Sequence, residues 1–205
     1  HHPWDVPRSE LHRVNWRDLD LPPAYLDGDE ARRGLGSKPK HWLGYYEASL
    51  WSNLESPRDY VPADMTPDQV REINAMTHIE NELIDEACQR VIDYLKAHDL
   101  YDHTDIFFTT DHGELQGDYG LMFKGPYHVD ALMLLPFIWK PGQIGVEPQV
   151  IDEPVGHVDL APTLCAIAGI EPEQMDGEVL PTSADEALQQ GRETTMTEWA
   201  SEHGP

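Results

Sequence analysis

The sequence has few basic residues and almost no cysteine. Its 205 residues include 14 Lys and Arg against 38 Asp and Glu, which gives a formal net charge of −24 at pH 7. A surface this negative repels phosphate backbones and anionic lipids, so binding to nucleic acid or to a membrane surface is not expected. The two cysteines, Cys88 and Cys165, cannot build a disulfide framework, and neither belongs to a CxxC pair of the kind that holds zinc.

Long apolar runs are missing as well. The longest, residues 131–139, contains a proline and falls far short of the roughly 20 residues that a membrane-spanning helix needs. An apolar content of 40% with 9% aromatics separates the chain from disordered acidic tails. We therefore expect a soluble, cytoplasmic protein. Because the sequence opens at His1 with neither an initiator Met nor a signal peptide, we also expect it to continue an upstream segment.

We predict one partial domain over residues 1–205, with three regions. Residues 1–65 are rich in Pro, Gly, Asp and Trp and show little periodicity, so an irregular region is expected, with a short helix near residues 42–53. Residues 66–170 contain the helical and strand patterns and should hold the core. Residues 171–205 begin a more C-terminal region.

The clearest predicted element is a long helix from Pro67 to about His98. Thr66 is a suitable N-cap, and proline is favoured at the first helical position. Apolar residues recur along this segment at helical spacing and predict a stripe that packs into the core: Val70, Ile73, the weak position Thr77, Leu83, Ile84, Ala87, Val91, Ile92 and Leu95.

Strand patterns follow the long helix. Buried strands are predicted at residues 104–110 and 134–139, and a further helix at residues 160–168, with Asp159 as its cap and Gly169 as its stop. This order predicts an α/β fold in which helices pack on a mixed, mostly parallel sheet. In open α/β sheets, ligands bind beyond the carboxyl ends of the strands.

Residues 111–114, Asp-His-Gly-Glu, follow the first predicted strand and are the main candidates for chemistry. Asp111 offers an oxygen ligand and His112 an imidazole, and Gly113 permits a sharp exit that lets both side chains face one cavity. Lys124 lies 12 residues after His112, between glycines, where a lysine can hold an anion beside a metal. The alternatives are an Asp-His pair that caps a turn and a solvated surface lysine.

Further motifs accompany this candidate site in a fixed order across most of the chain. They are Thr-Thr-Asp-His-Gly-Glu at 109–114, Gly-Asp-Tyr-Gly at 117–120, Lys-Gly at 124–125, Leu-Pro-Phe-Ile-Trp at 135–139, Gly-His-Val-Asp-Leu-Ala-Pro-Thr at 156–163, Ala-Gly-Ile at 168–170 and Met-Asp-Gly at 175–177. Together they resemble the sulfatases of the alkaline phosphatase superfamily, in particular the branch of arylsulfatases and phosphonate monoester hydrolases. The resemblance implies an alkaline-phosphatase-like fold, of which this chain is the C-terminal portion, with residues 1–65 on the substrate side.

The resemblance also implies a function, the metal-dependent hydrolysis of sulfate esters, with an anionic sulfate or phosphate ester as substrate. Asp111 and His112 match metal ligands of the family. Lys124 matches the lysine that contacts the sulfate or the leaving-group oxygen. His1 matches the histidine of the family's Pro-His-x-Pro loop, which faces the substrate; if the frame is shifted by one residue, His2 does.

Two cofactors are implied: one divalent metal ion, calcium or manganese, and a formylglycine made from Cys or Ser in a Cys/Ser-x-Pro-x-Arg motif. Neither Cys88 nor Cys165 lies in that motif, so we expect the nucleophile in the missing N-terminal part and an inactive isolated fragment. Many sulfatases carry Asn where this chain has His112. Because calcium prefers oxygen ligands, the imidazole shifts the expectation toward manganese, iron or zinc.

Several alternatives stay open at this stage. The substrate of the same superfamily could instead be a phosphonate or a phosphate mono- or diester. A non-catalytic acidic binding module is the alternative of another class, although such a module has no need of Asp111, His112 and Lys124 at these spacings. His128 is a second candidate for the pocket wall. An aromatic patch is interpreted first as packing, and second as a substrate wall or a contact in a homo-oligomer: Trp42, Tyr45, Tyr46 and Trp51.

Overall fold

The computed structural model describes residues 4–49, 61–143, 145–171 and 174–198, and they form two compact units. The first unit comprises His1–Tyr101 and His112–Pro136, and the second comprises Asp102–Asp111 and Phe137–Pro205. The chain therefore passes from one unit to the other between Asp111 and His112. No helix in the described ranges has both the length and the apolar character that a membrane crossing requires.

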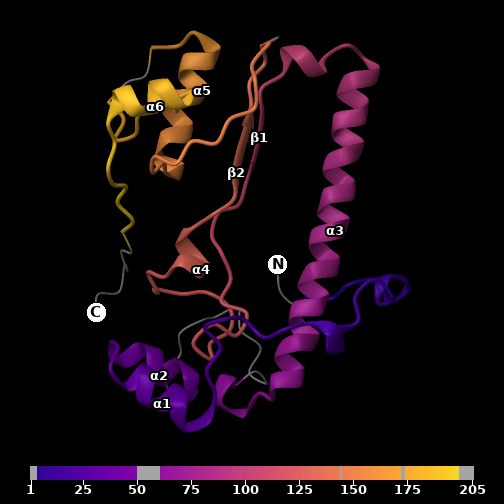
Figure 1. The fold of residues 1–205 in the computed structure, drawn as a ribbon, viewed down its shortest axis with the longest axis vertical. Coiled ribbons are helices and arrows are strands. Elements are labelled where there is room, and N and C mark those ends of the chain that lie inside the picture. The colour runs from indigo at the N-terminus through magenta and orange to yellow at the C-terminus, as the bar shows by residue number, and fades with distance from the viewer. Residues whose placement is uncertain (1–3, 50–60, 144, 172–173, 199–205) are drawn as a thin grey trace. The chain divides into compact units, whose positions relative to one another are not determined.

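The first unit is helical and carries the larger buried core (Figure 1). Its α-helices are α1 (Gly28–Gly36), α2 (Lys40–Tyr46), α3 (Pro67–Ala97) and α4 (Asp130–Met133), and its 3-10 turns are η1 (Arg8–Glu10), η2 (Trp16–Asp18) and η3 (Pro62–Asp64). The core gathers buried side chains of α1, α2 and the first turns of α3 around the segment 115–127. A further 3-10 turn, η4 (Tyr101–His103), precedes the first strand.

Residues 1–65 are more regular than expected, because α1 and α2 both lie there. The helix expected near residues 42–53 begins at Lys40 and ends at Tyr46, and residues 50–60 lie outside the described part of the chain. Of the aromatic patch, Trp42, Tyr45 and Tyr46 are all buried in the core, which confirms packing as their first role. Trp51 lies outside the described residues.

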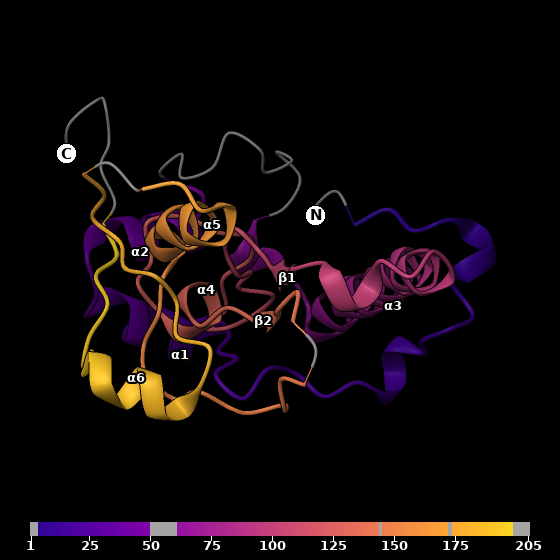
Figure 2. The same cartoon turned by 90° about the horizontal axis from the view of Figure 1, so that it is seen from above.

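Helix α3 begins as its sequence predicts and runs for 31 residues (Figure 2 views it nearly along its axis). The Thr66 hydroxyl accepts a hydrogen bond from the Gln69 amide, and the Gln69 side chain accepts one from the Thr66 amide, which satisfies two helix-end donors. The prediction of one continuous core-facing stripe is correct only for the first half. Val70 and Ile73 are buried, whereas Ile84 and Val91 are 49% and 59% exposed.

The second unit contains strands β1 (Ile106–Thr109) and β2 (Phe137–Lys140), the 3-10 turn η5 (His157–Asp159) and helices α5 (Leu160–Ala168) and α6 (Ala184–Gln190). The strands pair antiparallel, with Ile106 opposite Lys140, so this pair differs from the mostly parallel arrangement expected. A mixed sheet can contain an antiparallel pair of this kind. No parallel pair of strands occurs among the described residues. The Phe107 and Trp139 rings, directly opposite each other, stack with 5.2 Å between their centroids.

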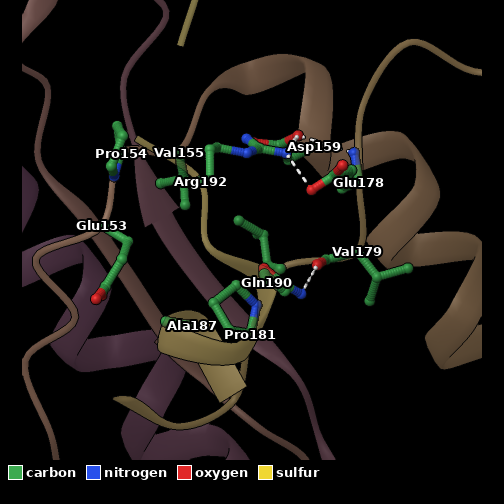
Figure 3. Close-up of a pocket in the computed structure, with 11 residues that line it drawn as sticks. Glu153, Pro154, Val155, Asp159, Glu178, Val179, Pro181, Ala187, Gln190 and Arg192 are labelled. Carbon is green, nitrogen blue, oxygen red and sulfur yellow. Dashed lines mark hydrogen bonds and ion pairs between the residues drawn. The ribbon is translucent and has the colours of Figure 1, made fainter. Parts of the chain in front are cut away.

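An ion pair holds the C-terminal segment of the second unit (Figure 3). Arg192 donates to both carboxylate oxygens of Asp159, at 2.5 and 3.0 Å, and to Glu178 at 3.1 Å. The Asp159 side chain also accepts hydrogen bonds from the backbone amides of Gly156 and Glu178. It therefore does not cap α5, contrary to expectation, whereas Gly169 ends α5 in the left-handed conformation as expected.

Burial alone raises the pKa of the Asp159 carboxyl, but the hydrogen bonds from Arg192, Glu178 and Gly156 outweigh it, and the net pKa lies below the ordinary value of 3.8. The cavity beside this cluster has a volume of about 10 Å³, room for about one water molecule. Arg192 thus ties its segment to Asp159 and Glu178, and the cluster acts as a structural clamp.

We expect Arg192→Met to destabilise the second unit by about 3 kcal/mol at pH 7, because it leaves a buried carboxylate without its cation. Since the folded-state pKa of Asp159 is depressed, this stabilisation is present above the unfolded-state pKa and is lost as the pH falls through the folded-state pKa. Thermal unfolding at pH 7 and about pH 2 measures both effects. Glu178→Gln, which alters a carboxylate 62% exposed, is the control and should change stability little. Equal losses for the two variants would contradict the clamp.

Candidate functional site

The backbone at Gly113 comes unusually close to a neighbouring segment. The Gly113 amide donates a hydrogen bond to the Leu132 carbonyl at 3.0 Å. A Cβ atom at position 113 would lie 1.9 Å from the Ala131 carbonyl oxygen, so no side chain fits there. Gly113 is not among the residues with positive φ. The glycine is thus required for the close approach of two backbone segments within the first unit.

His112 is half-buried, and its ring is oriented by a local contact. Its Nδ1 atom lies 2.8 Å from the Gly113 carbonyl oxygen. A carbonyl oxygen only accepts hydrogen bonds, so Nδ1 carries the proton, and in the neutral ring Nε2 keeps its lone pair. This arrangement is typical of metal-binding histidines, whose second nitrogen is held by a backbone carbonyl or a carboxylate. The local geometry therefore suits His112 as a ligand through Nε2.

A closed loop connects the His112 segment to Lys124. The Leu115 amide donates to the Phe123 carbonyl, and the Gly117 amide donates to the Leu121 carbonyl, both at 2.8 Å. This pairing brings the residues before Leu115 alongside those after Phe123. Lys124 thus follows one end of this loop, and the segment 112–114 precedes the other.

The loop contains strained backbone. Three of its residues other than glycine have φ in the left-handed region: Gln116 at 46°, Tyr119 at 58° and Phe123 at 64°. Helix α3 supports the first of them, because Asn74 donates to the Gln116 carbonyl at 3.2 Å and the Gln116 side chain donates to the Thr77 hydroxyl at 2.8 Å. Such conformations persist only where the surroundings impose them, and they concentrate at functional sites. The support also explains the polar Thr77 within the apolar stripe.

The other predicted site residues are placed as follows. Asp111 is exposed in the second unit and accepts a hydrogen bond from the Thr110 hydroxyl at 3.3 Å. Lys124 is half-buried, and His128 is exposed. His1 and His2 lie outside the described residues. Within the described ranges, no three His, Cys, Asp or Glu side chains converge as a set that could hold a metal.

Two contacts of this loop escaped sequence analysis. Burial raises the pKa of the half-buried Asp118, the residue that pairs with Tyr25 in an isolated antiparallel bridge. Trp4 stacks on Phe123 with 4.9 Å between the ring centroids, which places residue 4 beside the residue that precedes Lys124. Neither contact has a sequence signal, because each joins segments about 90 residues or more apart.

We expect Gly113→Ala to destabilise the first unit strongly, because the Ala131 carbonyl would have to move to admit one methyl group. A loss of about 3 kcal/mol or more in denaturant unfolding is the expected result. Gly36→Ala is the matched control, since a Cβ at position 36 meets no atom within 4 Å. A Gly113→Ala variant as stable as Gly36→Ala would contradict the close approach.

Comparisons with known proteins agree with these observations. Residues 76–170 match the sulfatase family model. The chain is 30% identical to the uncharacterised sulfatase YidJ of Escherichia coli over 179 residues, which cover 87% of this chain and 32% of that protein. It is 31% identical to the choline-sulfatase of Rhizobium meliloti over 117 residues, which cover 57% of this chain and 22% of that protein.

Solved structures give the same result for the fold. The phosphonate monoester hydrolase of Silicibacter pomeroyi superposes with a TM-score of 0.72 at 26% identity, covering 98% of this chain and 37% of that one. The enzyme of the same name from Agrobacterium radiobacter gives a TM-score of 0.71 at 23% identity, covering 88% and 35%. The chain thus spans about a third of the length of these relatives, and the expected alkaline-phosphatase-like α/β class is confirmed. Residues 76–170 therefore form a sulfatase-family domain, and the chain is similar to sulfatases and to phosphonate monoester hydrolases of the alkaline phosphatase superfamily.

Proposed function

We propose that this chain is part of a metal-dependent hydrolase of sulfate esters and supplies two metal ligands and one anion-binding lysine. The observation that carries the proposal is the ring orientation of His112: its Nδ1 donates to the Gly113 carbonyl, so Nε2 is the nitrogen that carries the lone pair in the neutral ring. That residue lies inside the segment that matches the sulfatase family.

Asp111 and His112 are the proposed ligands. A carboxylate oxygen and an imidazole nitrogen form a donor set that suits manganese better than calcium, because calcium selects oxygen. A divalent metal bound there would polarise the ester oxygens of the substrate. The chain's own contribution is to hold the ligands: Gly113 is pinned to Leu132, and its carbonyl in turn orients the His112 ring.

Lys124 is the proposed anion-binding residue. Its ammonium group would contact the sulfate or the departing oxygen and stabilise the negative charge that develops there. The closed loop from Leu115 to Phe123 supports this role, because it presents Lys124 beside the His112 segment. His1 or His2 is proposed as a further substrate contact from the family resemblance alone, and the exposed His128 is proposed because it lies close to Lys124 in the sequence.

The nucleophile is proposed to be a formylglycine outside these 205 residues, since neither cysteine lies in the modification motif. A phosphonate or phosphate ester is the second candidate substrate. It is favoured by the likeness to phosphonate monoester hydrolases, one of which covers 98% of this chain. Rates on an aryl sulfate and on an aryl phosphonate monoester, measured side by side in the enzyme, separate the two.

We expect manganese to raise the melting temperature of the protein and to have no such effect on Asp111→Ala or His112→Ala. At a metal concentration 100 times the dissociation constant, the expected stabilisation is about 2.7 kcal/mol. Asp152→Ala is the control, because Asp152 is another exposed aspartate of the second unit. Calcium and zinc, titrated in the same way, identify the preferred ion.

The same titration tests the alternative of a non-catalytic acidic module. Such a module would bind divalent ions diffusely through its net charge of −24, so all the variants would respond to manganese alike. That result would remove Asp111 and His112 from the site.

A further inference from the structure

The turn that follows Lys124 is held by side chains of helix α2. His41 Nε2 lies 3.2 Å from the Pro126 carbonyl oxygen, and because a carbonyl only accepts, the ring donates this hydrogen bond. The same ring stacks on Tyr127 with 5.4 Å between the centroids. The next residue, Trp42, packs edge-on against Tyr127 at 4.8 Å. Two consecutive residues of α2, His41 and Trp42, therefore contact two consecutive residues of the turn, Pro126 and Tyr127.

The segment before Lys124 is held by the same helix. Tyr45, one turn after His41, donates a hydrogen bond from its hydroxyl to the Met122 carbonyl at 2.8 Å. The two hydrogen bonds from α2 thus end on backbone carbonyls two residues before Lys124 and two residues after it. All of these residues belong to the first unit. A lysine between two anchored carbonyls has a fixed starting point for its side chain.

The turn packs tightly on the Tyr127 ring. Tyr127 is completely buried, and a Cβ atom at Gly125 would lie 2.7 Å from the Tyr127 ring. The turn also closes on itself, because the Tyr127 amide donates to the Gly125 carbonyl at 2.7 Å. Ordinary core packing would need the aromatic rings, but it would not need a ring nitrogen aimed at a loop carbonyl. The hydrogen bond from His41 therefore adds a directional anchor to the packing of the rings.

We propose that His41 is a positioning residue for Lys124: its hydrogen bond to Pro126 and its stack on Tyr127 fix the turn from which the lysine reaches the substrate anion. This inference rests on the proposed function of Lys124. Catalysis is sensitive to such support, because a displacement of about 1 Å in an active site can cost about a hundredfold in rate. His41 does not touch the substrate in this proposal and acts only through Lys124.

Two substitutions separate the two contacts of His41. His41→Phe keeps an aromatic ring on Tyr127 but removes the donor, and His41→Gln keeps a donor in place of Nε2 but removes the ring. In the enzyme, we expect kcat to fall about tenfold in His41→Phe, with KM little changed, and to recover to within about threefold in His41→Gln. Tenfold corresponds to about 1.4 kcal/mol. Tyr45→Phe, which removes only the hydroxyl bonded to Met122, should act in the same direction.

Amide hydrogen exchange gives a readout that does not depend on activity. We expect the amides of Tyr127 and Val129 to exchange about tenfold faster in His41→Phe than in the parent, while those of the buried α3 residues Ile73 and Ile79 stay unchanged. Unchanged exchange at Tyr127 and Val129 would overturn the proposal. Faster exchange throughout the unit would overturn it too, because it would show general destabilisation instead of a local anchor.

A double-mutant cycle with Lys124→Met distinguishes failure of this inference from failure of the proposed function. If His41 acts through Lys124, the loss caused by His41→Phe disappears in the Lys124→Met background. A loss that persists there in full overturns the positioning role and leaves the function of Lys124 intact. If Lys124→Met alone leaves kcat and KM unchanged, the proposed role of Lys124 fails, and the positioning role fails with it.

Discussion

The approach of the Gly113 backbone to the segment 131–132 is the constraint on which the candidate site depends. A hydrogen bond from the Gly113 amide and the absence of a side chain let the two backbones meet. The carbonyl of the same glycine orients the His112 ring. One residue without a Cβ atom thus permits the close approach to the segment 131–132, and its carbonyl sets which ring nitrogen of His112 carries the proton. A side chain at position 113 would push the two backbone segments apart. The same shift would move the Gly113 carbonyl that orients the His112 ring.

The Lys124 segment is determined by contacts of a different kind. A closed loop with left-handed residues brings it back toward the His112 segment, and helix α2 holds it through aromatic rings and two hydrogen bonds. Strained backbone and buried aromatic packing act together here: packing maintains conformations that isolated residues would leave. These contacts explain why the aromatic residues of α2, which lie far from Lys124 in the sequence, belong to the same core as the segment 115–127.

The exposed apolar positions of α3, such as Ile84 and Val91, contrast with the rest of that helix. On its other side, Arg13 forms ion pairs with Glu82 and Glu86 at 3.3 and 2.6 Å. The chain spans about a third of the length of its relatives, so it corresponds to only part of their fold. The helical spacing of apolar residues predicts that one face of a helix favours burial, but it does not predict which segment packs against that face.

The sequence by itself determined the helix from Pro67, the places of both strands, the stop at Gly169, and the pattern of Asp111, His112 and Lys124, because caps, periodicity and motif spacing are local properties. Only the tertiary structure decided the antiparallel pairing of the strands, the use of Asp159 in a clamp with Arg192 instead of a helix cap, and the grip of His41 on the turn after Lys124. Each of these joins residues at least 28 positions apart in the chain. Contacts at that range depend on which surfaces folding brings together, and no local pattern encodes them.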